Sequence, residues 1–145
     1  MNLQDAAKAA GITTSQSFFD ADGHLKLELV SKAGVEPKIK EMARDRPTLS
    51  RSQLRRFFNY CRKIERRLKS GQSDWGTERA NVAKLSCHAA DAVGKHRPKI
   101  PPSFHRFIES NVSMVKTERD FLDGFMQHFE ALVGFAALHL PKEER

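Results

Sequence analysis

The sequence predicts an all-α protein, a compact single-domain helical bundle of about five helices. Apolar residues recur at spacings of three and four along most of the chain, which is the period of helices with one buried face. No segment shows the apolar–polar alternation of a half-buried strand. A chain of 145 residues also has the size of one domain with one core.

The N-terminal part, residues 1–46, has the weakest helical pattern, and we expect loops and short helices that pack on the body. Residues 2–10 predict a short helix. Residues 11–24 predict a loop in which Phe18 and Phe19 anchor the chain to the core.

The next stretch fits two types of element. Residues 25–30 fit a helix or a short strand, and a helix is favoured because no second strand is available for pairing. Pro37 predicts the start of a helix over about residues 37–45, because proline suits the first helical turn, and Pro47 would end it.

Residues 47–140 predict the helical core, and residues 141–145 a short tail. The first core helix is expected to have Thr48 or Ser50 as its cap and to end near Gly71. Its buried stripe consists of Leu54, Phe57, Phe58, Cys61, Ile64 and Leu68.

Three more core helices are expected. Ser73 or Asp74 caps the first of these, which ends at about residues 94–97, and the prolines of residues 97–102 then force a break. Its inward residues are Trp75, Val82, Leu85, Ala89, Ala92 and Val93.

Ser103 is expected to cap the next helix, and the last one runs from about Glu118 to just before Pro141. The inward residues of these two helices are Phe104, Phe107, Ile108, Val112, Val115, Phe121, Leu122, Phe125, Phe129, Leu132, Val133 and Phe135. Most of the ten phenylalanines should therefore lie in the core, and any surplus would suit a protein interface.

Positive charge is concentrated at the first core helix. The chain has a net charge of +7, and residues 44–69 alone carry ten basic residues against Asp45 and Glu65, or +8, so the remainder sums to −1. This excess is too large for ordinary pairing within a helix. It favours a partner made of phosphates over the alternative of a merely solvated helix face.

The basic residues of this helix form two rows, of which the first lies about a third of a turn from the buried stripe and the second on the next stripe around. We expect them to contact nucleic-acid phosphates without base readout. Gln53, at the helix start, either positions the nucleic-acid backbone or caps the helix. The first row is Arg51, Arg55, Arg62, Arg66 and Lys69, the second is Arg56, Lys63 and Arg67, and Lys95, Arg97 and Lys99 extend the surface at another helix end.

No set of residues forms a convincing catalytic or metal constellation. The six histidines include no pair spaced i, i+4 with a partner carboxylate between them, so we expect no enzyme, no metal and no cofactor. Cys61 and Cys87 both fall on apolar stripes and are expected to be buried structural thiols. No disulfide framework, membrane-length apolar run or signal-peptide pattern is present, which favours a cytoplasmic protein.

Three blocks, in order over about residues 47–139, resemble the small subunit of the type III-A CRISPR effector, the Csm complex. PTLSRSQLRRFFNYCRKIE resembles that family's Ser-Gln-aliphatic-Arg helix through Ser52, Gln53, Leu54, Arg55 and Phe57. LSCHAADAVGKH resembles a small-residue helix in which Cys87 and His88 stand near the family's tyrosine. DFLDGFMQHFEALVGFAALH resembles a signature of spaced phenylalanines, with Phe135 in place of a tyrosine.

The resemblance implies a helical subunit without a catalytic centre, several copies of which stack beside a filament of backbone subunits. Its partners would be the guide RNA, the target RNA, the backbone and large subunits, and neighbouring small subunits, with no membrane. It would bind the guide–target duplex by its backbone and shape, in defence against viruses and plasmids.

Two other functions remain open from the sequence. One is a free-standing helical protein that binds DNA or RNA non-specifically, and the other is a small hydrolase or nuclease. The first-row arginines also have a second interpretation, in which they pair with acidic residues of a neighbouring subunit such as Glu118, Asp120 or Asp123.

Overall fold

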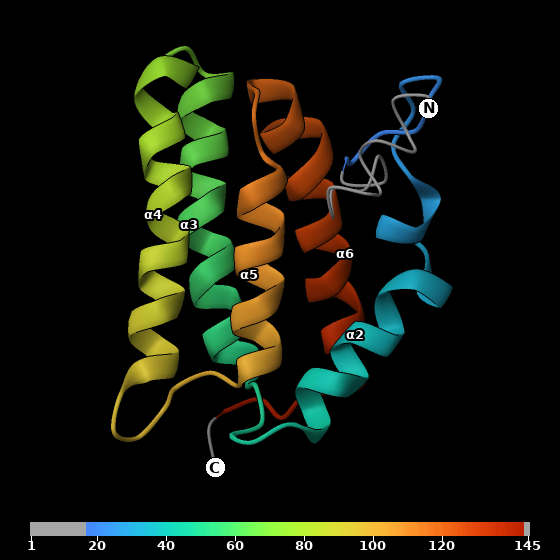
Figure 1. Ribbon diagram of the computed structural model, residues 1–145, viewed down its shortest axis with the longest axis vertical. Helices are drawn as coiled ribbons and strands as arrows, with labels where there is room; N and C mark the ends of the chain where they lie inside the picture. Colours follow the sequence, from blue (N-terminus) through green and yellow to red (C-terminus); the bar gives the residue numbers. More distant parts are fainter. Residues whose placement is uncertain (1–16, 144–145) are drawn as a thin grey trace, which may run out of the picture.

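A computed structural model describes residues 17–143 as a bundle of five α-helices with two short helical segments (Figure 1). The α-helices are α2 (Lys32–Arg44), α3 (Arg51–Lys69), α4 (Trp75–Gly94), α5 (Pro102–Met114) and α6 (Met126–Ala136). The short segments are η1 (Leu27–Leu29), a 3-10 turn, and η2 (Asp120–Phe125), a π-helical stretch. The prediction of an all-α fold is confirmed.

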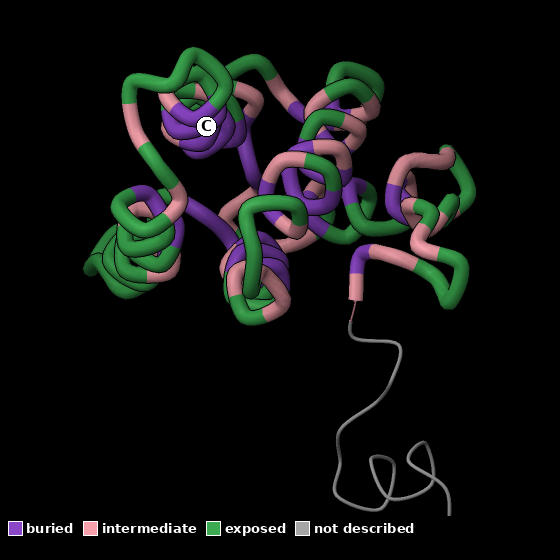
Figure 2. The backbone as a smooth tube through the Cα atoms, turned by 90° about the horizontal axis from the view of Figure 1, so that it is seen from above, coloured by how far each residue is buried: buried purple, intermediate pink, exposed green. Residues whose placement is uncertain are grey.

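The helices form one layered bundle. The long helices α3 and α4 run antiparallel, α4 packs on both α3 and α5, and α6 packs on both α3 and α2. Figure 2 shows that the buried side of each helix faces the middle of the bundle and the exposed side faces outward. Within residues 17–143 no helix is long and apolar enough to cross a membrane.

Phenylalanine rings fill the core, as the helical spacing predicts. Eight of the ten phenylalanines are buried, and Phe19 and Phe135 are the two partly buried exceptions. Phe104 on α5 lies 5.3 Å, between ring centroids, from Phe57 on α3 and 6.3 Å from Phe129 on α6, both edge-on. Such contacts between rings tie three helices to one cluster.

The predicted limits of α3 and α4 are confirmed. Ser50 caps α3 by accepting a hydrogen bond from the Gln53 N–H through Oγ at 3.2 Å, so Thr48 is not the cap. Asp74 caps α4 in the same way through the Thr77 N–H at 2.8 Å. Gly71, just after α3, has a φ of +79°, in the left-handed region that glycine occupies without strain.

The predicted start of α2 at Pro37 is wrong. The helix begins at Lys32, and its cap is Ser31, whose Oγ accepts a hydrogen bond from Gly34 N–H at 3.3 Å. Pro37 therefore lies inside the helix, where it has no N–H to donate. Packing of Val35 and Ile39 in the core holds the helix together across the proline.

Ser103 is not the cap of α5, which was also wrongly predicted. The helix begins at Pro102 with Pro101 before it, and a proline at the first position loses no helical hydrogen bond. The N–H of Ser103 donates instead to Oδ2 of Asp45, at 2.9 Å, so the end of α2 satisfies the start of α5.

The N-terminal expectations are partly confirmed. Phe18 is fully buried and Phe19 packs on the core, so both anchor the N-terminal segment as predicted. Residues 25–30 contain η1, but Leu25 pairs with Phe19 in an isolated antiparallel bridge. The predicted helix over residues 2–10 lies outside the described residues.

The last predicted helix is divided. Residues from Asp120 form η2 before α6 continues to Ala136. Gly124 in η2 permits a close approach of Phe18, because a Cβ at this position would lie 2.6 Å from Cβ and Cγ of Phe18. The absence of a side chain thus lets the N-terminal segment lie directly on the helix. Leu122, Val133 and Phe135 are only partly buried.

Candidate nucleic-acid interface

The buried stripe of α3 fixes the direction of its basic residues. Every residue of the predicted stripe is buried, together with Glu65. Burial also raises the pKa of the Cys61 thiol, which therefore stays protonated, as expected of a structural cysteine. Cys87 is exposed, which corrects its predicted burial: it lies on the outer side of α4, away from Leu85 and Ala89.

The two basic rows border different neighbours of α3. The first row follows the side of α3 that packs on α6, where Nη2 of Arg62 lies 4.0 Å from Oε1 of Glu130. The second row follows the side that packs on α4, where Arg67 contacts Glu78. The predicted separation of the rows is therefore present in the fold.

Arg67 is committed to a contact within the fold. Its Nε and Nη2 donate to Oε2 and Oε1 of Glu78 at 3.0 and 2.8 Å, and Glu78 is buried. The Arg67 guanidinium is the main reason that the pKa of Glu78 is lowered to about 2. Sequence reasoning missed Glu78, although a glutamate on the inner side of a helix next to a basic helix was the available signal.

Arg62 and Lys69 are also paired within the fold. Both contact the buried carboxylate of Glu65, at 2.7 Å from Arg62 Nη1 and 3.5 Å from Lys69 Nζ. Hydrogen bonding to Glu65 raises the pKa of Arg62. These two cations partly neutralise a buried acid, so less of their charge is available to a ligand.

Four cations of α3 remain exposed, and the described part of the chain offers them no ion pair or hydrogen-bond partner. They are Arg55, Arg56, Lys63 and Arg66. At about 100° per residue they share the outward side of the helix, opposite the buried stripe, and they extend over about 16 Å of its axis. We call this surface the outward face of α3.

Arg51 differs from the rest of its row. Its N–H donates to the Pro141 carbonyl oxygen at 2.8 Å, while its Nε is buried and has no partner among the described residues. The start of α3 is thus held by the C-terminal segment, a contact that the spacing of residues cannot indicate.

A groove between α3 and α4 gathers several predicted residues that are far apart in the sequence. It has a volume of about 360 Å³. Gln53 lines this groove, while Ser50 caps the helix, which favours the first of the two roles predicted for Gln53. Arg97 is exposed in the loop after α4 and is not part of it. The groove residues, which define the α3–α4 groove, are Gln53, Arg56, Phe57, Tyr60, Leu85, His88, Asp91, Ala92, Lys95 and Lys99.

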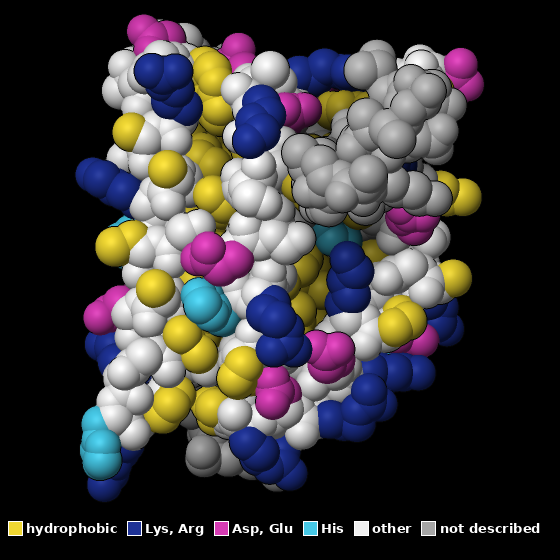
Figure 3. All heavy atoms as spheres, in the orientation of Figure 1, with side chains coloured by type: hydrophobic (Ala, Val, Ile, Leu, Met, Phe, Trp, Pro, Cys, Tyr) yellow, Lys and Arg dark blue, Asp and Glu magenta, His cyan; other side chains and the backbone are white. Residues whose placement is uncertain are grey.

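The face drawn in Figure 3 carries a different pattern of charge. On this face α5 lies in front of α3, and the Lys and Arg side chains are scattered among carboxylates and apolar atoms.

The acidic residues proposed as alternative partners of the first-row arginines differ from one another. Asp120 accepts hydrogen bonds from the N–H groups of Lys116 and Thr117 at 2.9 and 3.1 Å, whereas Glu118 and Asp123 are exposed.

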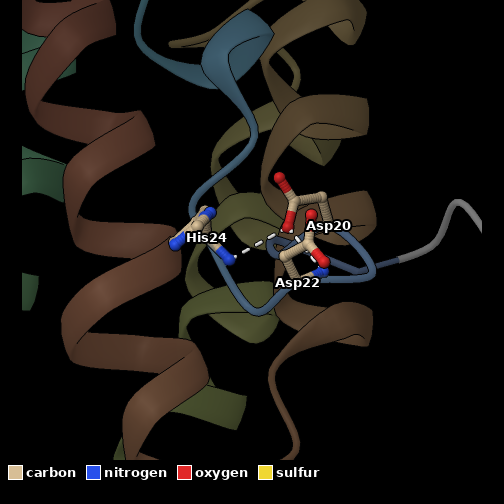
Figure 4. A group of neighbouring side chains, drawn as sticks. All are labelled: Asp20, Asp22 and His24. Carbon is tan, nitrogen blue, oxygen red and sulfur yellow. Dashed lines mark hydrogen bonds between the residues drawn. The ribbon is translucent and has the colours of Figure 1, made fainter.

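One group of potential metal ligands occurs among the described residues. Oxygen and nitrogen atoms of Asp20, Asp22 and His24 lie within 4.8 Å of one another in an exposed turn (Figure 4). Oδ1 of Asp20 accepts hydrogen bonds from the N–H groups of Asp22 and His24, at 2.9 and 3.0 Å. The cluster is therefore explained by the turn that it closes.

His128 is buried for a structural reason. Its Nδ1 lies 2.6 Å from the Leu29 carbonyl oxygen, which can only accept, so Nδ1 carries the proton. Nε2 then faces Nζ of Lys38 at 3.4 Å. Burial is the main cause that lowers the pKa of His128 to about 4. This histidine joins η1 and α2 to α6.

Comparison with known proteins places these features in a family. A family model described as Csm2 Type III-A matches residues 25–141, most of the chain. The match extends from the three resembling blocks into the segment before residue 47. Neither the curated proteins nor the solved structures give a match.

Proposed function

We propose that this chain, which belongs to the Csm2 family of type III-A CRISPR complexes, is a non-catalytic RNA-binding subunit. In this proposal several copies stack along the duplex of guide and target RNA, in contact with the backbone and large subunits and with one another. The complex would act in the cytoplasm, in defence against viruses and plasmids.

The outward face of α3 is the observation that carries the proposal. Four exposed cations, which have no ion-pair partner within residues 17–143, lie on one side of one helix that is held in place by its buried stripe. Phosphates of a nucleic acid attract such rows of charge without regard to sequence. We assign Arg55, Arg56, Lys63 and Arg66 to the RNA, with Arg51, Arg97, Lys95 and Lys99 at its edges. Arg62, Arg67 and Lys69 would mainly hold the fold.

The titratable groups support a role without catalysis. Among the described residues, the groups with strongly shifted pKa values are Cys61, Glu78 and His128, and each is explained by burial or by a contact between helices. Strongly shifted groups in an active site would instead converge on a shared cavity.

The test separates RNA binding from assembly. Arg55 and Arg66 would both be changed to Glu, and the variant would be co-expressed with the other subunits of the complex. We expect the complex to assemble and to bind target RNA at least tenfold more weakly, as about 1.4 kcal/mol corresponds to a factor of ten. If much less complex assembles, but the fraction that does assemble binds target RNA as tightly as the wild type, these arginines pair with a neighbouring subunit instead. The matched control is Arg79→Glu with Lys84→Glu, which changes charge equally on exposed positions of α4.

A further inference from the structure

The α3–α4 groove differs from the outward face of α3 because it adds aromatic rings and an apolar wall to its cations. We propose that this groove holds one unstacked nucleotide of an RNA strand, with the base beside Tyr60 and His88 and the phosphate near Arg56 and Lys95. The inference rests on the proposed RNA binding of this chain and adds a base-binding position to it.

The size and lining of the groove suit a base. Its volume of about 360 Å³ is within the range of sites for small molecules. The buried side chains of Phe57, Leu85 and Ala92 form its inner wall, and the polar residues stand nearer the solvent. A nucleotide has the same division, with apolar base faces and a charged phosphate.

The two rings of the groove are held in a fixed arrangement. Tyr60 and His88 lie 5.0 Å apart between ring centroids, with their planes at 76°. The Tyr60 hydroxyl donates to the carbonyl oxygen of Asn81 at 2.8 Å, which fixes the tyrosine ring, while His88 is exposed. Rings of this kind accept unstacked bases of any identity, because every base has a π-face.

The charge of the groove favours an anion. Arg56, Lys95 and Lys99 line it against one carboxylate, Asp91. Lys95 pairs with Asp91 at 3.4 Å, but both side chains are largely exposed, and such surface pairs contribute little and exchange readily. Arg56 also belongs to the outward face of α3, so a strand bound there passes directly over the groove.

The test compares three fluorescently labelled RNA duplexes by anisotropy, at low salt and with the full chain. One duplex is uninterrupted, one has a single bulged nucleotide, and one has an abasic bulge at the same place. We expect the duplex with the bulged base to bind about fivefold more tightly than the duplex with the abasic bulge. This factor follows from the lower limit of the free energy of stacking a base on an aromatic ring. The gain should be similar for all four bases.

The variants locate the effect. His88→Ala should remove the gain and leave binding of the uninterrupted duplex unchanged, and Lys95→Ala should reduce binding of the bulged duplex. The controls His105→Ala on α5 and Lys84→Ala on α4, neither in the groove, should keep the gain. Adenosine monophosphate should compete only weakly with the bulged duplex. If adenosine monophosphate bound more tightly than the bulged duplex, the groove would be assigned to a free nucleotide instead.

Equal affinity for base and abasic bulges, with duplex binding intact, would overturn the groove inference and leave the proposed function standing. No binding to any of the three duplexes, by the chain alone or in its complex, would overturn both.

Discussion

Arg67 of α3 and Glu78 of α4 are joined by two hydrogen bonds, from Nε to Oε2 at 3.0 Å and from Nη2 to Oε1 at 2.8 Å. The carboxylate is buried and the guanidinium is partly exposed, so the pair connects the surface of the helix hairpin to its interior. Asn81 also donates to Oε1, at 3.0 Å. A residue of the predicted RNA-binding rows therefore holds two helices together.

Replacement of Arg67 by Ala should destabilise the fold. It leaves the buried carboxylate of Glu78 without its main partner. The cost should be about 1–3 kcal/mol, below that of a fully buried pair because the guanidinium is partly exposed. Urea unfolding measures the effect, with Lys63→Ala as the matched control, which should stay within about 0.5 kcal/mol of the wild type. If Arg67→Ala were as stable as the wild type but bound RNA as weakly as Arg55→Ala, Arg67 would be assigned to RNA binding.

Two glycines of the last helical region should respond in opposite directions to alanine. Gly124→Ala places a Cβ 2.6 Å from Phe18 and should destabilise by about 1–3 kcal/mol, the usual result of overpacking. At Gly134, on a helix, an added Cβ would have no described residue within 4 Å, so Gly134→Ala should stabilise by about 0.5–1 kcal/mol. Thermal unfolding of both variants checks the pair of signs, and a Gly124→Ala variant as stable as the wild type or more stable would contradict the packing of Phe18.

Buried His128 should make the protein sensitive to mild acid. Its pKa is lowered from 6.5 to about 4, so the folded state favours the neutral ring. The stabilisation is complete above about pH 6.5 and is lost as the pH falls toward 4, by up to about 3 kcal/mol. Protonation would also bring a positive ring against Lys38.

The measurement for His128 is urea unfolding at several pH values between 4 and 7. His128→Asn should lower stability at neutral pH and flatten its dependence on pH in this range, whereas His96→Asn, at an exposed position, controls for the loss of one histidine. An unchanged pH dependence in His128→Asn would show that another group causes it.

The two thiols should differ in reactivity. Cys87 is exposed, while Cys61 is 1% exposed and has a raised pKa. A thiol reagent should therefore modify Cys87 in the native protein and Cys61 only after unfolding, as mass spectrometry of peptides can show. Rapid native labelling of Cys61 would mean that α3 does not pack as described.

The fold could be predicted where the signal is local. The buried stripe of α3 and the caps at Ser50 and Asp74 follow from spacing and from side chains next to the helix. The error at α2 arose because Pro37 was given more weight than the local cap at Ser31, although the core packing of Val35 and Ile39 holds the helix across the proline. The error at α5 arose from a tertiary contact, since Asp45 takes the N–H of Ser103.

The candidate site was predictable in its helix but not in its division of roles. Helical periodicity places the cations on the two sides of α3, yet it contains no information on which of them meet a buried acid on another helix. Glu65 was visible within the same helix, whereas Glu78 reaches Arg67 only through the fold. The groove that brings Gln53 beside Lys95 and Lys99 depends on the packing of α3 against α4 in the same way.

The division of the cations on α3 is tested most directly by the salt dependence of binding to an RNA duplex. Each cation that contacts a phosphate should contribute about one unit to the slope of log K against log salt. Changing Arg55, Arg56, Lys63 and Arg66 to Ala should make the salt dependence shallower, by about three to four units of this slope. The same loss of charge at Lys32, Arg79, Lys84 and Lys116, exposed positions outside α3, should leave the slope nearly unchanged. Equal slopes for both variants would contradict the assignment of the outward face of α3 to RNA.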